Sequence, residues 1–341
     1  MTPRSPFLLL TATLLATACA GQDRTFVVEL EPVPLPAANG DAHVMERTPL
    51  ASARLPASGW LTRFEVELVD GNGRPLPQYM LHHVNVMVPE QRDLFRPIMQ
   101  RLVAAGEETE PIDLPWPLGV RAAEGQELLV FGMLHNPTDI DHGDVTVRVK
   151  LHYARSPRLS VQPLFIDASP PPGPAGWDLP PGRSTRSWEG RAAVDGRILA
   201  LGGHLHRYGV ELVLEDVTAG RVLYRERPVL DEDGAVAHVP RRTFLGRMGH
   251  AIRQDHTYRI TVVYENPTGE TIPDGAMGAV GGVIRSRRGG WIAADPDDPL
   301  YRQDLTGLDS GLPGHDHHAG SAAPGDVDPH AGHDGHDGHV H

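Results

Sequence analysis

Turn-forming residues run through the whole chain, with 37 glycines and 32 prolines among its 341 residues. Proline removes a backbone hydrogen-bond donor and glycine weakens regular elements, so long helices are disfavoured and short strands joined by turns are favoured. Several segments alternate apolar and polar residues with the period of two that a strand requires. The chain is also long enough to bury a sizeable core without disulfide bonds. We therefore expect an all-β fold.

The clearest expected strands are residues 61–69 and 79–88, which follow one another across an Asp-Gly-Asn-Gly turn at residues 70–73. Residues 94–105 are expected to form a helix or a long excursion between strands, although Pro97 limits where a helix can begin. The remaining expected strands cover residues 25–30, 145–153, 159–166, 184–193, 197–215, 221–227 and 257–265.

Composition divides the chain into six segments. A Ser-Pro-Pro-Pro-Gly-Pro run within residues 169–176 predicts a linker between two all-β halves. From His315 onward, glycine, aspartate, alanine and histidine dominate, which is typical of a disordered region. The expected order is a signal peptide at 1–19, a tether with one strand at 20–58, a first domain at 59–168, the linker at 169–176, a second domain at 177–300 and a disordered His-rich tail at 301–341.

The start of the chain predicts export. An apolar run at residues 7–15 follows Arg4 and is too short to span a bilayer. Ala16, Thr17 and Ala18 then precede Cys19, in a pattern that resembles a bacterial lipoprotein signal whose cysteine is lipidated. An ordinary cleaved secretory signal is the alternative, because Ala16 stands where leucine is usual. Either route exports the protein, and lipidation anchors it to the membrane of the bacterial cell envelope.

Charge and cysteine content exclude several classes of function. The formal net charge is -13, and nucleic-acid binding requires a basic face, so nucleic acid is not an expected partner. Cys19 is the only cysteine. If it is lipidated, no thiolate remains for blue-copper, iron-sulfur or cysteine-zinc chemistry.

Two histidine pairs lie in strand-like sequence, His82-His83 and His204-x-His206. Adjacent side chains on a regular strand point to opposite faces, so His82 and His83 reach one metal ion only if the strand bulges or ends there. His204 and His206 share the parity of an apolar face that extends to Leu214, so both imidazoles point the same way. Imidazole is the commonest protein metal ligand. The layout predicts one metal site in each half.

Each pair is followed by a segment that ends in Asn-Pro-Thr, which is a weak internal repeat. Asn136 and Asn266 of these segments are expected to form turns that cap strands. In the first half His135 precedes the turn and gives a third imidazole. In the second half Met277 follows in a Gly-rich run, and its soft thioether favours Cu(I) over zinc, calcium or magnesium. Two histidines with a methionine therefore indicate copper.

The order of these motifs resembles that of the copper type II, ascorbate-dependent monooxygenases, the family of peptidylglycine alpha-hydroxylating and dopamine beta-monooxygenases. The resemblance covers roughly residues 60–285 and includes the Gly-His-Leu-His-x-x-Gly segment. It implies two jelly-roll-like β-sandwich domains in tandem, each with one copper ion. The family's animal enzymes are rich in disulfides, which this chain with its single cysteine is not. The resemblance implies an electron-transfer set of His82, His83 and His135 and an oxygen-activating set of His204, His206 and Met277.

Three functions follow from this pattern. The first is an exported monooxygenase that hydroxylates a C–H bond of a small-molecule or peptide substrate with O2, two coppers and an external reductant such as ascorbate. The second is a non-catalytic copper-binding or copper-buffering surface lipoprotein, whose tail binds additional metal ions weakly. The third is a mononuclear iron or cupin-like site in which Glu265 joins His204 and His206. Met248 competes with Met277 as the thioether ligand.

Overall fold

The computed structural model describes residues 24–37, 45–169, 176–232, 234–247, 249–287 and 291–310. Cys19, the proline-rich run of the linker, Met248 and the chain from residue 311 onward lie outside the described residues. Nearly all regular structure in the described part is β-strand, so the expected all-β class is confirmed. No helix among these residues has the length and apolar character needed to cross a bilayer.

The elements follow the chain in two halves. The strands of the first half are β1 (Arg24–Glu29), β2 (Val33–Leu35), β3 (Met45–Arg47), β4 (Ala51–Arg54), β5 (Gly59–Asp70), β6 (Pro75–Leu76), β7 (Leu81–Arg92), β8 (Met99–Gly106), β9 (Ile112–Asp113), β10 (Leu118–Ala122), β11 (Glu127–His135), β12 (His142–Ala154) and β13 (Leu159–Asp167). Those of the second half are β14 (Gly176–Leu179), β15 (Gly182–Arg191), β16 (Gly196–Leu205), β17 (Gly209–Asp216), β18 (Arg221–Glu226), β19 (Val229–Leu230), β20 (Val236–Thr243), β21 (His250–Ile252), β22 (Thr257–Asn266) and β23 (Ile272–Ser286). Two 3-10 turns, η1 (Gln78–Met80) and η2 (Leu245–Arg247), and one helix, α1 (Pro299–Ser310), complete the described chain.

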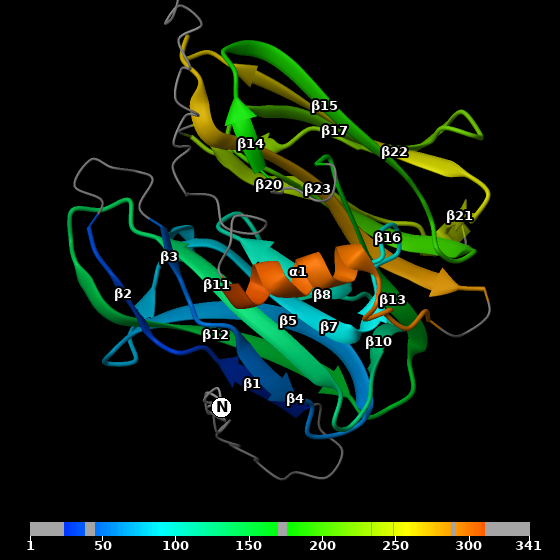
Figure 1. The fold of residues 1–341 in the computed structure, drawn as a ribbon, viewed down its shortest axis with the longest axis horizontal. Helices are drawn as coiled ribbons and strands as arrows, with labels where there is room; N and C mark the ends of the chain where they lie inside the picture. The colour runs from blue at the N-terminus through cyan, green and yellow to red at the C-terminus, as the bar shows by residue number, and fades with distance from the viewer. Residues whose placement is uncertain are drawn as a thin grey trace, which may run out of the picture.

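The described strands form three sheets (Figure 1). A 14-stranded sheet runs through both halves, a five-stranded sheet contains β7, β8 and β11, and a four-stranded sheet contains β15, β17, β18 and β22. Strand β13 joins the halves, because it pairs with both β10 and β23. The first pair with β10 is Leu159 with Leu118, and the first pair with β23 is Gln162 with Ile284. The two halves therefore share one continuous sheet, in addition to the covalent connection between them.

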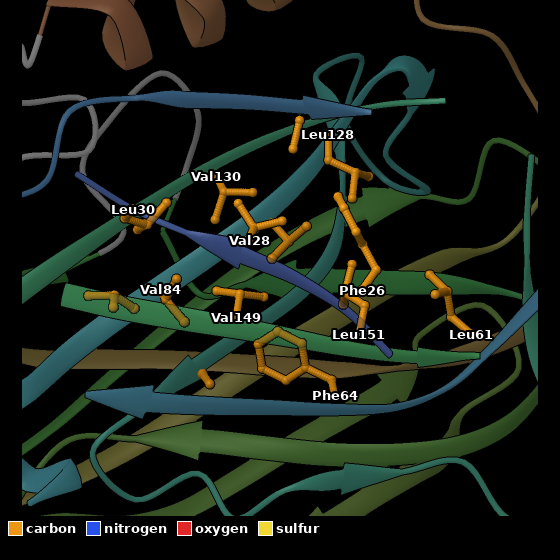
Figure 2. Packing of buried hydrophobic residues seen from close by; sticks show 14 of the residues in the cluster. Phe26, Val28, Leu30, Leu61, Phe64, Val84, Leu128, Val130, Val149 and Leu151 are labelled. Carbon is orange, nitrogen blue, oxygen red and sulfur yellow. The ribbon is translucent and has the colours of Figure 1, made fainter. Parts of the chain in front are cut away.

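Each half has its own apolar core, because alternate residues of two facing sheets point inward. In the first half Val28 and Val149 of the large sheet lie in the same cluster as Val84 and Val130 of the five-stranded sheet (Figure 2). In the second half the cluster includes Tyr258 and its neighbours on β22. Burial of one such side chain stabilises the fold by about 1.5–3 kcal/mol. The expected pair of β-sandwiches is thus confirmed.

Most expected strands are present within two residues of their predicted ends, but the expected strand at 197–215 is interrupted. Strand β16 ends at Leu205, and β17 begins at Gly209 in a different sheet. Tyr208 between them has a φ of 69°, a left-handed conformation that redirects the chain. The even-numbered alternation of this segment therefore spans two strands and a turn.

Two other predictions from the first half are wrong. Residues 94–105 form neither the expected helix nor a long excursion. The Asp93 carboxylate accepts hydrogen bonds from the backbone N–H groups of Phe95 and Arg96 in a short bend, and β8 begins at Met99. The described part of the segment at 20–58 contains four strands where a tether with one strand was expected. These short strands pair with β11 and β12, which satisfies their backbone groups at the sheet edges.

Residues 299–310 form helix α1, although the disordered tail was expected to begin at 301. The Asp298 carboxylate accepts a hydrogen bond from the Leu300 N–H at the start of the helix. Tyr301 and Leu308, two turns apart, pack in one cluster with Met87 and other residues of the five-stranded sheet. This apolar stripe distinguishes the helix from the Gly, Asp and His sequence that follows.

Candidate metal centre

A β-bulge brings His82 and His83 together. On β11, Met133 is paired with His83 while the next residue, Leu134, is paired with Leu81, so His82 is the extra residue of the bulge. The two imidazole centroids are 4.5 Å apart. The sequence predicted that this pair can reach one metal ion only at a bulge or a strand end, and the bulge is present.

His135 ends strand β11 beside this bulge, with its ring centroid 6.0 Å from that of His82. Its Nε2 atom forms a hydrogen bond with the Tyr79 carbonyl and lies 3.7 Å from Oε2 of Glu107. The Asn-Pro-Thr turn that follows is held by Asn136, whose side chain donates to the Ile140 carbonyl and accepts from the Thr138 N–H.

The second Asn-Pro-Thr turn has the same hydrogen bonds. Asn266 donates to the Glu270 carbonyl and accepts from the Thr268 N–H. Both asparagine side chains are also buried, so each satisfies backbone groups that water cannot reach. The expected internal repeat is confirmed, and it places His135 and Glu265 at matching positions ahead of the two turns.

His204 and His206 lie at the end of β16 and in the turn that follows, with ring centroids 5.1 Å apart. Strand β16 runs antiparallel to β23, and its last residue, Leu205, pairs with Gly278. His206 follows Leu205 and Met277 precedes Gly278, so the two residues lie across from each other. The hydroxyl of Tyr264 accepts hydrogen bonds from the backbone N–H groups of His206 (3.0 Å) and Met277 (3.1 Å), and donates to the Met277 carbonyl. One buried phenol thus fixes the separation of these two backbone segments.

The two expected ligand sets meet. The His82 and His206 ring centroids are 5.6 Å apart, a separation close to those found within each set. The imidazole rings of the two halves are therefore close neighbours. No group of three or more His, Cys, Asp or Glu side chains in the described ranges is arranged to hold a metal ion. The expectation of a separate site in each half is corrected, because the shared sheet places the end of β16 against the bulge in β7.

Two consecutive carboxylates reach both sets. Glu107 and Glu108 follow β8, and Oε1 of Glu108 lies 2.5 Å from Nδ1 of His204. Burial alone would raise the pKa of Glu108, but the charge and hydrogen bond of His204 hold it below its usual value. The same contact raises the pKa of His204 against the opposite effect of burial. A carboxylate of the first half therefore orients an imidazole of the second.

A cavity of about 560 Å³ adjoins the histidines and is lined by His83, His204 and Met277 among others. Most of its wall is apolar and comes from β8 and the shared sheet. Gly202 and Gly281 face each other on neighbouring strands of this wall. A Cβ atom on Gly202 would lie 3.2 Å from Cγ of Arg241, and one on Gly281 would lie 3.3 Å from the Phe165 ring. The absence of side chains at these two positions leaves space in the cavity.

Other candidates from the sequence lie elsewhere. Glu265 is half-exposed and pairs with Arg183 at 3.4 Å, so the expected alternative of a triad with His204 and His206 is wrong. The alternation of β22 explains this, because Tyr264, its neighbour, takes the inward position. His152 lies on β12, with Nε2 2.6 Å from Oε1 of Glu65.

Three residues of this centre were missed from the sequence. Glu107 and Glu108 lie in a loop with no recognisable motif, and Tyr264 reads as an ordinary apolar position of a strand. The one available signal was the repeat itself, which places Tyr264 two residues before Asn266, while Leu134 occupies the equivalent position before Asn136. A hydroxyl at an otherwise apolar position is a sign that a buried polar group requires a partner.

No family model matches this chain, and no curated protein matches it. Among solved structures, the chain is similar to PNGase F, a glycosylasparaginase from Flavobacterium meningosepticum, with 9% identity, a TM-score of 0.38 and coverage of 77% of this chain and 96% of that one. It is also similar to a chain from the structure of Sulfolobus Turreted Icosahedral Virus, with 7% identity, a TM-score of 0.36 and coverage of 84% and 96%.

Proposed function

We propose that this protein is an exported, copper-dependent monooxygenase that uses O2 and an external reductant such as ascorbate to hydroxylate a C–H bond. The observation that carries the proposal is the meeting of five histidines, His82, His83, His135, His204 and His206, at one place beside a cavity that Met277 also lines.

The donor types favour copper. Imidazole nitrogens bind both oxidation states of copper, and a thioether at Met277 favours the reduced state. Copper bound here would supply one-electron transfer and the activation of O2. A hydroxylation by O2 inserts one oxygen atom into the C–H bond and reduces the other to water, with two electrons from the reductant. The two ligand sets provide for two ions, which matches the two electrons required.

Glu108 and Tyr264 prepare the second set for this role. Because the Glu108 carboxylate accepts a hydrogen bond at Nδ1 of His204, the proton of the neutral imidazole lies on Nδ1 and the lone pair lies on Nε2. Tyr264 holds the backbones of His206 and Met277 at a fixed separation. Glu108 and Tyr264 thereby help to orient three donors, His204, His206 and Met277.

The cavity favours a neutral, mainly apolar substrate. The arginines on its wall are already engaged: Arg101 binds Asp167 at 3.1 Å, and Arg241 donates to the carbonyls of Glu110 and Pro111. The Glu108 carboxylate is likewise bound to His204. An apolar substrate gains about 25 cal/mol for each Å² buried, whereas a charged one loses its hydration against a wall that is mainly apolar.

The test begins with copper content. A version of the chain that ends at residue 310 removes the tail histidines and retains the described residues, and we expect it to bind two copper ions. With ascorbate and a panel of neutral amides and aromatic compounds, we expect oxygen uptake and a product heavier by one oxygen atom in mass spectrometry. Copper binding with no turnover on any compound would favour the buffering function, and no copper binding would contradict both.

A further inference from the structure

A second, larger cavity lies at the other end of β16 and β23, away from the histidines. Its volume is about 1170 Å³, above the range of roughly 300–1,000 Å³ that is usual for small-molecule sites. The first residues of β13 and β16, the turn after β21 and the last residues of β23 form its wall. These segments lie together at one edge of the molecule (Figure 1).

Four arginines line this groove: Arg197, Arg253, Arg285 and Arg287. Their concentration is unexpected in a protein with a formal net charge of -13. Arg197 and Arg285 are directly opposite each other on β16 and β23, and directly opposed residues of antiparallel strands point to the same face. Like charges in this arrangement are destabilising.

The acidic residues of the groove do not neutralise the charges of Arg253, Arg285 and Arg287. Within the described ranges, no acidic side chain forms an ion pair with Arg253, Arg285 or Arg287. Asp195 accepts a hydrogen bond from the backbone N–H of Gln254, and Asp255 lies 3.9 Å from the His256 ring nitrogen. Neither of these two wall carboxylates therefore forms an ion pair with Arg253, Arg285 or Arg287.

We propose that this groove binds an anionic ligand that carries at least two phosphate, sulfate or carboxylate groups. The planar guanidinium group binds such groups with two parallel hydrogen bonds, which an ammonium group does not provide. Arg197 donates to the Gly249 carbonyl at 3.0 Å, and an anion beside Arg285 offsets the repulsion between the two opposed charges. The size of the groove provides space for a second anionic group near Arg253 or Arg287. This site is independent of the copper proposal, since it shares no residue with the histidine centre.

The experiment uses the full-length, metal-free protein and isothermal titration at constant ionic strength. Tripolyphosphate and citrate are the oligovalent probes, and acetate is the monovalent control. We expect measurable binding of at least one oligovalent probe and none of acetate. Tighter binding of tripolyphosphate assigns the site to phosphate- or sulfate-type ligands, and tighter binding of citrate assigns it to carboxylates. Failure of both probes to bind would overturn the proposal.

Arg285→Gln and Arg287→Gln test the location of the site. Each should weaken binding of the preferred probe by roughly tenfold or more, because a charge-assisted hydrogen bond is lost. Arg285→Gln should also raise the melting temperature of the ligand-free protein, since it removes the opposed charge. Arg183→Gln is the matched control, because it makes the same charge change on the four-stranded sheet. Equal affinity in the two groove variants and the control would place the anion elsewhere and overturn the proposal.

Discussion

The contact between Glu108 and His204 makes the most specific prediction about the copper centre. Replacement of Glu108 by alanine removes a 2.5 Å contact to Nδ1 of His204, in a place where the carboxylate is only 7% exposed. Loss of the hydrogen-bond partner behind a metal ligand typically lowers metal affinity about 10- to 100-fold, or about 1.4–2.7 kcal/mol. Because water has little access to take its place, we expect Glu108→Ala near the upper end of this range.

Glu108→Gln should lie near the lower end, because its amide oxygen still accepts a hydrogen bond from Nδ1 but carries no charge. Glu110→Gln is the control, since Glu110 is exposed and lies in the same segment. The assay is a competitive Cu(I) titration against a chromogenic chelator, with the chain ending at residue 310. Folded variants that all bind copper with the affinity of the wild type would refute the assigned role of Glu108. A wild type that binds no copper would refute the copper proposal itself.

Three further predictions follow from the same geometry. Tyr264→Phe leaves the buried N–H groups of His206 and Met277 without their acceptor, so copper affinity should fall and the free energy of unfolding should drop by about 1–3 kcal/mol. Tyr258→Phe is the control: it loses one hydrogen bond at the far end of β22 and should leave copper affinity unchanged. His82→Ala should lower copper occupancy in both ligand sets, because the His82 ring adjoins those of His83 and His206. If electron paramagnetic resonance shows that copper is lost from one ligand set alone, the shared centre is contradicted. Asp167→Asn breaks a buried contact with Arg96 and Arg101 and should cost about 3–5 kcal/mol in chemical denaturation. Burial would raise the pKa of Asp167, but the two guanidinium groups hold this pKa below its usual value. The stabilisation that Asp167 contributes is therefore complete above about pH 4 and is lost as the pH falls through the depressed folded pKa. If Asp167→Asn destabilises the protein equally at pH 3 and pH 7, this origin is contradicted.

The local chemistry of the centre could be predicted from the sequence. The need for a bulge at His82 and His83 follows from the geometry of a single strand. The turns at Asn136 and Asn266 follow from the preference of asparagine for hydrogen bonds to its own backbone neighbourhood. Each of these predictions depends on residues that lie close together in the chain.

Two structural features depended on packing and were predicted incorrectly. Tyr301 and Leu308 acquire a helix only because the five-stranded sheet offers an apolar surface to them. Strand β16 stops before Tyr208 because the chain must leave one sheet and enter the other. Propensity and periodicity do not contain this information, since tertiary contacts supply most of the free energy of a short element.

The sequence by itself determined which donor atoms this protein carries, because ligand chemistry belongs to the side chains. Only the tertiary structure decided that His82 and His206, from opposite halves, lie 5.6 Å apart, and that Glu108 of the first half hydrogen-bonds to His204 of the second. These contacts result from the pairing of β13 with β23, which joins two sheets into one and closes the halves upon each other. Such a pairing brings together residues about a hundred positions apart in the chain, and no pattern in either half alone specifies it.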